Sequence, residues 1–375
     1  MRKSRNISSE VKIGHANDDH HNRNQMARVK ENSNDECYTP IDEIERELSY
    51  WASLGKFEGK RILCPCDLKI SAEVAAVQID FSPPDTVTII YNNVERENFG
   101  LFDLIDKKYE IKKSIIDRNK VESILGDSPV SNFVRVFIRH AREWKISAIT
   151  ASGYNPKTNE GIRFQDINFN AYDMIVTNPP FSCYSEFMDK VVDKVDFISI
   201  APFLNRVAAN IGLPMMLRKV YIGKSGDEYG GYSSIDFITD TGKKVNVGCD
   251  WITSFNEAQE ERNIRLHNSS NGIKFDPHAN YLVMGNMTMK DGTHPIRVPS
   301  KDFPEDYDGW MYASVNILSY ISHDDYDWYG TNYMKYFNTT NPQANPFNHK
   351  IVLGMTKVNG QGGFNGIVFR KKQII

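Results

Sequence analysis

A short proline-rich loop carries the residue types in this chain that are best suited to chemistry. Residues 172–177 are largely apolar and predict a buried strand, which is followed directly by Asn178, Pro179, Pro180 and Phe181. In open α/β sheets ligands bind beyond the carboxyl ends of the strands, where this loop is expected. Each proline fixes φ and lacks an N–H, so the loop is stiff. The Asn178 amide oxygen and the Pro179 carbonyl offer two acceptors and Phe181 offers a flat ring, a set that suits a conjugated amino group.

The loop resembles a known catalytic motif. It is similar to the Asn-Pro-Pro-Phe or Asn-Pro-Pro-Tyr sequence of the amino-methyltransferases that use S-adenosylmethionine, which marks transfer to an exocyclic nitrogen, most often N6 of adenine. The resemblance implies catalytic roles for Asn178, Pro179, Pro180 and Phe181. The alternative is a plain turn, because Asn-Pro is a common turn dipeptide. The apolar strand ahead of the loop favours the motif.

Composition limits the class of protein. With 375 residues, 40% of them hydrophobic and 25% charged, the chain has the makeup of an ordinary soluble globular protein with room for a catalytic domain and a smaller one. The net charge of -3 gives no global positive field, so contacts with nucleic acid would come from local basic clusters. The five cysteines are odd in number and form no CxxC pair, which favours a reduced cytoplasmic setting and predicts no structural metal. No apolar run reaches membrane-spanning length, so no membrane partner is expected.

Changes in composition divide the chain into three parts. Residues 1–34 lack aromatic residues and are rich in Lys and Arg, and we expect a disordered basic arm that either contacts a polyanion weakly or is a solvated tail. Residues 35–260 predict a catalytic domain with a charged insertion at about 96–145. Residues 261–375 mix aromatic side chains with Asn, His and Lys, which predicts a smaller C-terminal α+β region that recognises the target.

Within the predicted catalytic domain, patterns typical of strands and of helices alternate. Strands are expected at 61–66, 87–91, 146–150, 173–177 and 197–202, helices at 41–55, 71–78 and 184–193, a helical pattern at 96–145 and a hairpin at 245–254. Thr39 followed by Pro40 and Asp42 predicts the start of the first helix, with Thr39 as its N-cap. The arginines between residues 135 and 142 share one helix face, which is either solvated or in contact with phosphates. The alternation predicts an α/β fold with a Rossmann-like sheet and helices on both faces.

The cofactor side of the predicted sheet departs from the usual pattern. Turns that bind S-adenosylmethionine after the first strand normally contain glycine, but this turn consists of Cys64, Pro65, Cys66 and Asp67. Tyr38 and Thr39 lie just upstream of a capped helix, in a segment that resembles the one holding the methionine carboxylate at backbone amides in such methyltransferases. Both segments are therefore candidates for binding the cofactor.

Two further candidates follow from their position beside strands. Asn92, Asn93 and Glu95 come after the second strand, where an acid usually accepts the ribose hydroxyls, and Glu95 is the acid among them. Asp166 precedes the catalytic strand, at the position from which an Asp usually accepts the adenine amino group of S-adenosylmethionine. Acids after strands are also common surface residues, so the ordered set carries more weight than any one member.

The combined layout resembles one family closely, the EcoRI-type adenine-specific DNA methyltransferases. The matching segments are residues 35–39, the turn at 64–67, the loop at 178–182, Pro-x-Asp-Tyr-Asp-Gly at 304–309 and a basic aliphatic finish at 369–375. The resemblance implies a site-specific DNA adenine N6-methyltransferase whose partners are S-adenosylmethionine and double-stranded DNA. It also implies a restriction-modification enzyme with a companion restriction endonuclease, or an orphan or phage modification enzyme.

The mechanism that this resemblance implies is direct displacement, with the target adenine flipped out of the duplex and stacked on Phe181. Two alternatives stay open: a methyltransferase that acts on an RNA base or a protein amide, and a catalytically inactive DNA-binding relative, which the missing glycines suggest. The length of the region after residue 261 suits the reading of several base pairs and favours DNA. In that region, segments 302–321 and 333–350 have the composition of a recognition surface more than of a core.

Overall fold

The structure, a computed structural model, describes most of the predicted catalytic domain and separate parts of the C-terminal region. The described residues are 37–68, 74–83, 85–92, 109–115, 132–155, 160–202, 214–215, 218–225, 234–239, 242–261, 274–285, 288–289, 291–300, 303–314, 317, 325–330 and 366–372. The predicted arm at 1–34, Asn93, Glu95 and the segment 333–350 lie outside them.

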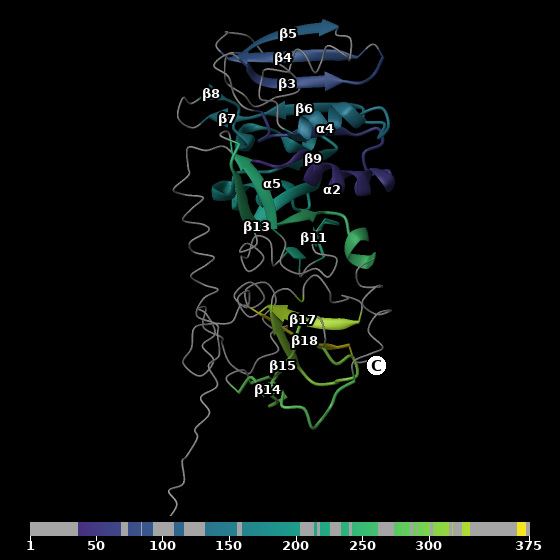
Figure 1. The fold of residues 1–375 in the computed structure, drawn as a ribbon, viewed down its shortest axis with the longest axis vertical. Coiled ribbons are helices and arrows are strands. Elements are labelled where there is room, and N and C mark those ends of the chain that lie inside the picture. The colour runs from purple at the N-terminus through teal and green to yellow at the C-terminus, as the bar shows by residue number, and fades with distance from the viewer. Residues whose placement is uncertain are drawn as a thin grey trace, which may run out of the picture.

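One mixed sheet of 11 strands forms the larger part of the fold (Figure 1). Its centre is a parallel block in the order β10 (Asp196–Pro202), β9 (Met174–Thr177), β2 (Arg61–Cys64) and β6 (Ala148–Ser152). Beyond β6 the sheet continues antiparallel through β3 (Val74–Asp80), β4 (Thr86–Asn92) and β5 (Tyr109–Ile115). Beyond β10 it continues antiparallel through β13 (Lys244–Thr253), β12 (Ser234–Thr239) and β1 (Cys37–Tyr38), and β11 (Tyr221–Ile222) also pairs with β13.

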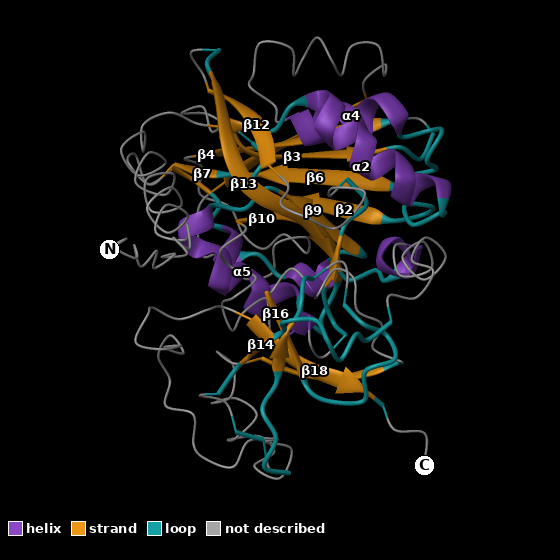
Figure 2. Cartoon of the chain, turned by 60° about the horizontal axis from the view of Figure 1, so that its bottom comes forward, coloured by secondary structure: helices purple, strands orange, loops and turns teal. Residues whose placement is uncertain are grey.

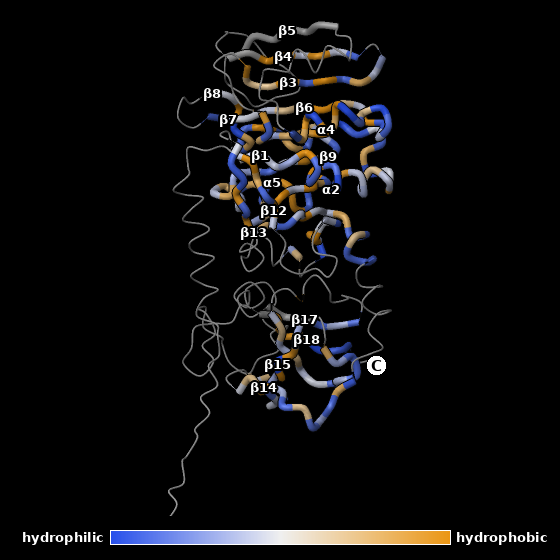
Figure 3. Tube along the Cα trace, in the orientation of Figure 1, coloured by the Kyte–Doolittle hydropathy of each residue, from blue (hydrophilic) through white to orange (hydrophobic). Residues whose placement is uncertain are grey.

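Helices cover both faces of this sheet, as expected from the sequence. The side chains of β9 alternate between two cores, because Met174 and Val176 belong to one buried cluster and Ile175 to the other. The first cluster also contains residues of α2 (Ile41–Ser53) and α4 (Asn132–His140), and the second contains residues of η1 (Phe164–Asp166), η2 (Phe169–Ala171) and α5 (Tyr184–Val191). Figure 2 shows α2 and α4 on one side of the sheet and α5 on the other. Figure 3 shows apolar residues along the central strands. The strand β9 therefore lies at the centre of a three-layer arrangement.

Two predictions about the first half of the chain are wrong. The segment predicted as a helix at 71–78 contributes to β3, which pairs with β4 on one side and β6 on the other. The insertion predicted to be helical contains the strand β5 as well as the helix α4. In both cases pairing with neighbouring strands outweighs the local preference: β3 lies between β4 and β6, and β5 pairs with β4. The sheet is consequently mixed, and only its centre follows the parallel pattern that the alternation predicted.

The helix α2 begins after Pro40 and ends before Gly55, close to the predicted bounds. The predicted N-cap is wrong, since Pro40 occupies the cap position and no side chain caps the helix there. Thr39 is instead buried, and its carbonyl accepts a hydrogen bond of 2.7 Å from Asn132 Nδ2 at the start of α4. Gly55 has a φ of +72°, which only glycine adopts freely, and this stops the helix.

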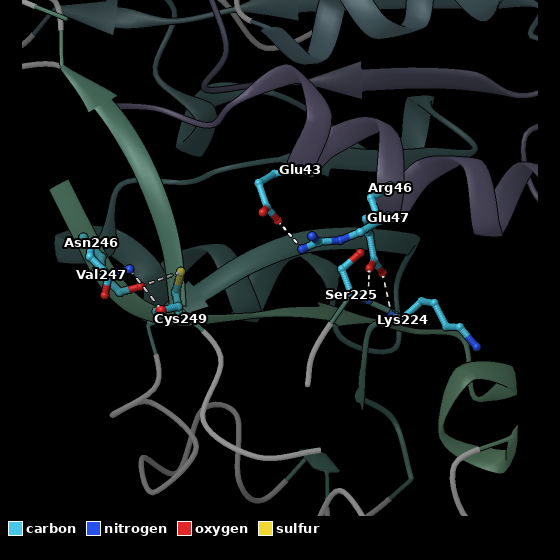
Figure 4. A network of polar contacts seen from close by, with 9 residues as sticks. Glu43, Arg46, Glu47, Lys224, Ser225, Asn246, Val247 and Cys249 are labelled. Carbon is cyan, nitrogen blue, oxygen red and sulfur yellow. Dashed lines mark hydrogen bonds and ion pairs between the residues drawn. The ribbon is translucent and has the colours of Figure 1, made fainter. Parts of the chain in front are cut away.

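A buried carboxylate joins α2 to the segment that follows β11 (Figure 4). Glu47 is fully buried and accepts hydrogen bonds from Trp51 Nε1 at 2.7 Å, from the Lys224 amide at 2.9 Å and from the Ser225 amide at 2.6 Å. Gly223 lies so close that a side chain there would collide with Glu47. Because three donors surround it, the carboxylate is satisfied without water.

The C-terminal region contains a separate five-stranded sheet. Its order is β14 (Leu282–Val283), β15 (Ile296–Arg297), β16 (Met311–Ser314), β18 (Gly366–Lys371) and β17 (Tyr326–Gly330). Edge-to-face contacts of Phe303, Tyr326 and Phe369, with ring centroids 5.3 to 5.9 Å apart, form its core. A sheet of this kind can fold only when segments from 282 to 371 come together.

The aromatic residues of the predicted recognition segment 302–321 are core residues where the structure describes them. Trp310 and Tyr312 are 5% and 2% exposed, and Met311 belongs to the same buried cluster as Ile175 of the large sheet. Tyr307, in the stretch that resembles the family's late motif, stacks on Phe275 with ring centroids 4.4 Å apart. Trp310 and Tyr312 therefore serve the core, and a role of the segment in recognition stays a prediction. Composition alone did not separate the two, because aromatic side chains serve both.

Candidate active site

The loop with the predicted catalytic residues leaves the carboxyl end of β9. All four residues of β9 are buried, and the strand has a parallel neighbour on each side, β2 and β10. After Thr177 the chain passes through Asn178, Pro179 and Pro180 into the short helix η3 (Phe181–Cys183), and α5 follows directly. We call residues 178–183 the catalytic loop. Its position at a central strand end confirms the strand predicted ahead of it.

Within the catalytic loop, the acceptor oxygen of Asn178 is buried and available. Asn178 Oδ1 is shielded from solvent and has no hydrogen-bond partner among the described residues. Pro179 is buried, Pro180 is exposed, and the half-buried ring of Phe181 packs against both core clusters. A shielded carbonyl oxygen without a partner is costly unless a donor arrives, so this atom suits an incoming N–H group.

The turn after β2 lies beside this loop, and a serine on the next strand fixes it. In the register of β2 and β9, Leu63 pairs with Ile175, which puts the turn level with the start of the catalytic loop. Ser152 at the end of β6 donates from Oγ to the Pro65 carbonyl at 3.2 Å, and its own carbonyl accepts from the amides of Asp67 and Leu68. These bonds define the shape of a turn that has no glycine.

The turn after β2 and the catalytic loop come together at Cys66. Burial raises the pKa of the Cys66 thiol well above its usual value, and the nearby Asp67 carboxylate and Cys183 raise it as well, while the nearby Thr177 side chain lowers it. Thr177 ends β9 and Cys183 ends the catalytic loop, so both ends of that loop lie near the turn. The Cys64 thiol is fully buried and its pKa is likewise raised, by burial first and then by Asp67 and Cys66. Both thiols are therefore neutral, and neither is poised as a nucleophile.

Asp166 lies on the surface of a segment that packs against α5. The segment starts beside the end of β6, where the Ile162 amide donates to the Gly153 carbonyl at 2.7 Å. Lys190 of α5 donates to the Ile167 carbonyl at 2.8 Å; partial burial lowers the pKa of Lys190 and the nearby Asp166 raises it. No contact among the described residues joins Asp166 to the catalytic loop, so its predicted role in holding adenine stays a prediction.

The other predicted cofactor residues lie further from the loop or outside the described residues. Tyr38 is in β1, and β12, β13 and β10 stand between β1 and β9 in the sheet. Thr39 is buried, and its hydroxyl oxygen has no hydrogen-bond partner in the part of the chain that the structure describes. Glu95 was predicted from its place after the strand at 87–91, which is β4, and β4 lies between β3 and β5 and runs antiparallel to both. The role of Glu95 itself stays a prediction.

Comparison with known proteins agrees with this arrangement. The sequence model of the family described as "Adenine-specific methyltransferase EcoRI" matches residues 25–372. The chain belongs to this EcoRI-type methyltransferase family. A type II methyltransferase of Escherichia coli, M.EcoRI, is 23% identical over 326 residues, which cover 80% of this chain and 87% of that protein. The residues that the family model matches include the segments of both sheets.

Three buried residues of this EcoRI-type methyltransferase escaped the sequence reasoning. Ser152 shapes the turn after β2, and Tyr184 and Asp250 lie behind the catalytic loop. Asp250 is 1% exposed and lies in the buried second half of β13 between Cys249 and Trp251, and a charged residue between these two is the signal in the sequence that could have found it. The other two are ordinary residue types in ordinary positions, and only their contacts distinguish them.

Two further features of the described residues bear on the class of chemistry. No group of three or more His, Cys, Asp and Glu side chains among them is arranged to hold a metal ion. No helix in the described part is long and apolar enough to cross a membrane.

Proposed function

We propose that this protein transfers the methyl group of S-adenosylmethionine to N6 of an adenine in double-stranded DNA. One observation carries the proposal: the shielded Oδ1 of Asn178, which has no hydrogen-bond partner among the described residues, lies at the carboxyl end of the central strand β9, beside the turn that follows β2. In a sheet of this type that edge is where a ligand binds. An amino group that enters there would find an acceptor already in place.

The catalytic loop would act by polarising the amino group. The N6 lone pair of adenine is delocalised into the ring and is a poor nucleophile. Hydrogen bonds from the amino group to Asn178 Oδ1 and to the Pro179 carbonyl would draw the nitrogen toward tetrahedral geometry and stabilise its developing positive charge. The stiffness of the two prolines holds both acceptors in place before the base arrives. Phe181, half-buried between the two cores, would stack on the flipped adenine.

The turn after β2 has the chemistry to hold the cofactor. When bound, S-adenosylmethionine supplies the activated methyl group on its sulfonium. Asp67 is 6% exposed and its carboxylate lies beside Cys66, where it would attract the positive charge of the methionine portion. The Cys64 and Cys66 thiols are neutral, so Asp67 is the group in this turn that carries the negative charge. Four further residues are proposed to complete the cofactor site: Tyr38, Thr39, Glu95 and Asp166. The buried Thr39 hydroxyl has no hydrogen-bond partner among the described residues, so it is available to the cofactor.

Residues 261–375 are proposed to recognise the DNA target. The buried cluster that runs from Ile175 to Met311 and Phe369 joins their sheet to the α5 side of the large sheet, which would keep a recognition element in fixed geometry to the catalytic loop. Reading of bases in the groove would then select one adenine for flipping. In a restriction-modification system this methylation protects the host from a companion endonuclease.

The proposal is tested by the product. The purified protein would be incubated with methyl-labelled S-adenosylmethionine and with duplex DNA, RNA or a protein lysate in parallel. We expect label in the duplex alone, and N6-methyladenine in the nucleoside digest. Label in RNA or protein would favour the alternative substrates, and binding of duplex without any transfer would indicate an inactive relative. Methylation-sensitive sequencing of DNA from an expressing host would then identify the target site.

A further inference from the structure

The residues on either side of the catalytic loop both lie next to Ser199 of the strand β10. The residue before the loop, Thr177, pairs with Ser199 of β10 in the parallel register. The residue after the loop is Tyr184, the first residue of α5, and its hydroxyl lies 3.1 Å from Ser199 Oγ. One serine therefore lies opposite the residue that precedes the loop and contacts the residue that follows it.

This contact is sealed from solvent. Tyr184 is 1% exposed and Ser199 is fully buried, and the Tyr184 ring packs on Phe187 with centroids 5.8 Å apart. Asp250 of β13, the strand beside β10, is 1% exposed and near enough to act on the phenol. Burial raises the pKa of Tyr184 far above its usual value, the bond with Ser199 lowers it, and Asp250 raises it. The phenol thus stays neutral and its hydrogen bond does not titrate over any ordinary working pH.

We propose that Tyr184 is a positioning residue for methyl transfer, which fixes the far end of the catalytic loop through its hydrogen bond to Ser199. The short helix η3 links this anchor to the reacting end of the loop, since the Cys183 amide donates to the Pro180 carbonyl at 3.0 Å. Movement of Tyr184 would therefore move Pro180 and, through it, Asn178. The inference rests on the proposed function, because it assigns Tyr184 an effect through the acceptors of that loop.

The chain offers a matched control in Tyr172. This residue is also buried, at 6% exposure, and its phenol lies beside the hydroxyl of Thr150 in the strand β6. It precedes β9 instead of following the catalytic loop. The Tyr172 hydroxyl has no hydrogen-bond partner among the described residues, so Tyr172→Phe removes a buried phenolic oxygen without breaking a hydrogen bond that the structure shows. It controls for loss of a buried phenolic oxygen near β9, and thermal unfolding of Tyr172→Phe and Tyr184→Phe measures any effect on stability.

The experiment compares single-turnover methylation rates of the full-length protein at saturating S-adenosylmethionine and target duplex. Tyr184→Phe and Ser199→Ala are each expected to slow the step about 10-fold, since small errors in the placement of acceptors are costly in catalysis. Because the two residues act through one bond, the double variant should be no slower than Tyr184→Phe. Tyr172→Phe should stay within about 2-fold of wild type, and the dissociation constant of S-adenosylmethionine should be unchanged within about 2-fold in all four variants.

The outcomes separate this inference from the proposed function. Wild-type rates in both Tyr184→Phe and Ser199→Ala would overturn it, as would an equal slowing in Tyr172→Phe, which would indicate a general loss of stability. Multiplying effects in the double variant would also overturn it, because they would place the two residues in separate roles. If Asn178→Ala is inactive while Tyr184→Phe is fully active, the positioning role of Tyr184 is refuted and the proposed function is retained. If Asn178→Ala keeps its turnover, the proposed function fails and this inference falls with it.

Discussion

Replacement of Asn178 by alanine removes the acceptor on which the proposed chemistry depends. Asn178 Oδ1 makes no hydrogen bond among the described residues, so its removal breaks no bond that the structure shows in the free protein. We therefore expect the free energy of unfolding to change by less than about 1 kcal/mol, as for substitutions that leave caps, networks and large side chains intact. Thermal unfolding of Asn178→Ala and of wild type should nearly coincide.

The effect on the transition state should be much larger. Loss of one preorganised hydrogen-bonding group that faces developing charge costs about 2.7 to 4 kcal/mol, or roughly a 100- to 1000-fold lower rate. The cofactor turn is formed by other residues, so the affinity for S-adenosylmethionine should stay within about 2-fold of wild type. The substitution should thus separate binding of the cofactor from its use.

The assay measures transfer of labelled methyl groups in a single turnover to a duplex that carries the target site, together with calorimetric titration of the cofactor. Asn170→Ala is the matched control, because it truncates an exposed asparagine just ahead of β9 and should keep wild-type rates. A single-turnover rate for Asn178→Ala within about 3-fold of wild type would refute the reasoning, since that corresponds to less than 1 kcal/mol of transition-state stabilisation.

Three other variants test separate parts of the molecule. Asp166→Ala should weaken S-adenosylmethionine binding while leaving specific DNA binding largely intact; an unchanged dissociation constant in calorimetry would place the adenine contact elsewhere. Glu47→Ala should lower the free energy of unfolding by about 3 kcal/mol or more in urea, because it leaves the indole of Trp51 and the Lys224 and Ser225 amides without their acceptor, whereas Glu47→Gln should lose less. An unchanged urea midpoint for Glu47→Ala would contradict that role. Truncation after residue 260 should abolish sequence-specific DNA binding, measured by anisotropy competition against scrambled duplex, and should also lower the melting temperature, because the apolar cluster continues across the cut. Retained sequence preference would place recognition before residue 260.

Local pattern was enough to predict the elements that carry the chemistry. The strand at 173–177, the helix after Pro40 and the helix after Cys183 appear where the sequence indicates them. The hairpin predicted at 245–254 is wrong in detail, because that segment is almost entirely the single strand β13, which pairs with the preceding strand β12. Each of the other three elements is defined by the spacing of its apolar residues and by a Pro or Gly near one of its ends. Both signals come from residues close together in the sequence. The catalytic loop could be predicted for the same reason: its stiffness and its acceptors belong to consecutive residues.

Tertiary structure decided which distant segments became neighbours. Whether the stretch from Val74 became a helix or a strand depended on pairing with β4 and β6, and only the folded chain decided that β6 lies beside β2. The role of Thr39 changed likewise, from a cap on its own helix to a buried contact with Asn132. These outcomes depend on contacts between segments far apart in the chain, whose energies no local pattern records.

The properties of the candidate site divide in the same way. The sequence by itself determined that an amide oxygen and a carbonyl follow a buried strand on a stiff loop. Only the folded chain decided that the amide oxygen of Asn178 is shielded and has no partner in the described part of the chain, that Cys66 lies near Thr177 and Cys183, and that Tyr184 contacts Ser199. Shielding and hydrogen bonding are set by every segment packed around an atom, so they become defined only when the sheet and both of its covering layers are assembled.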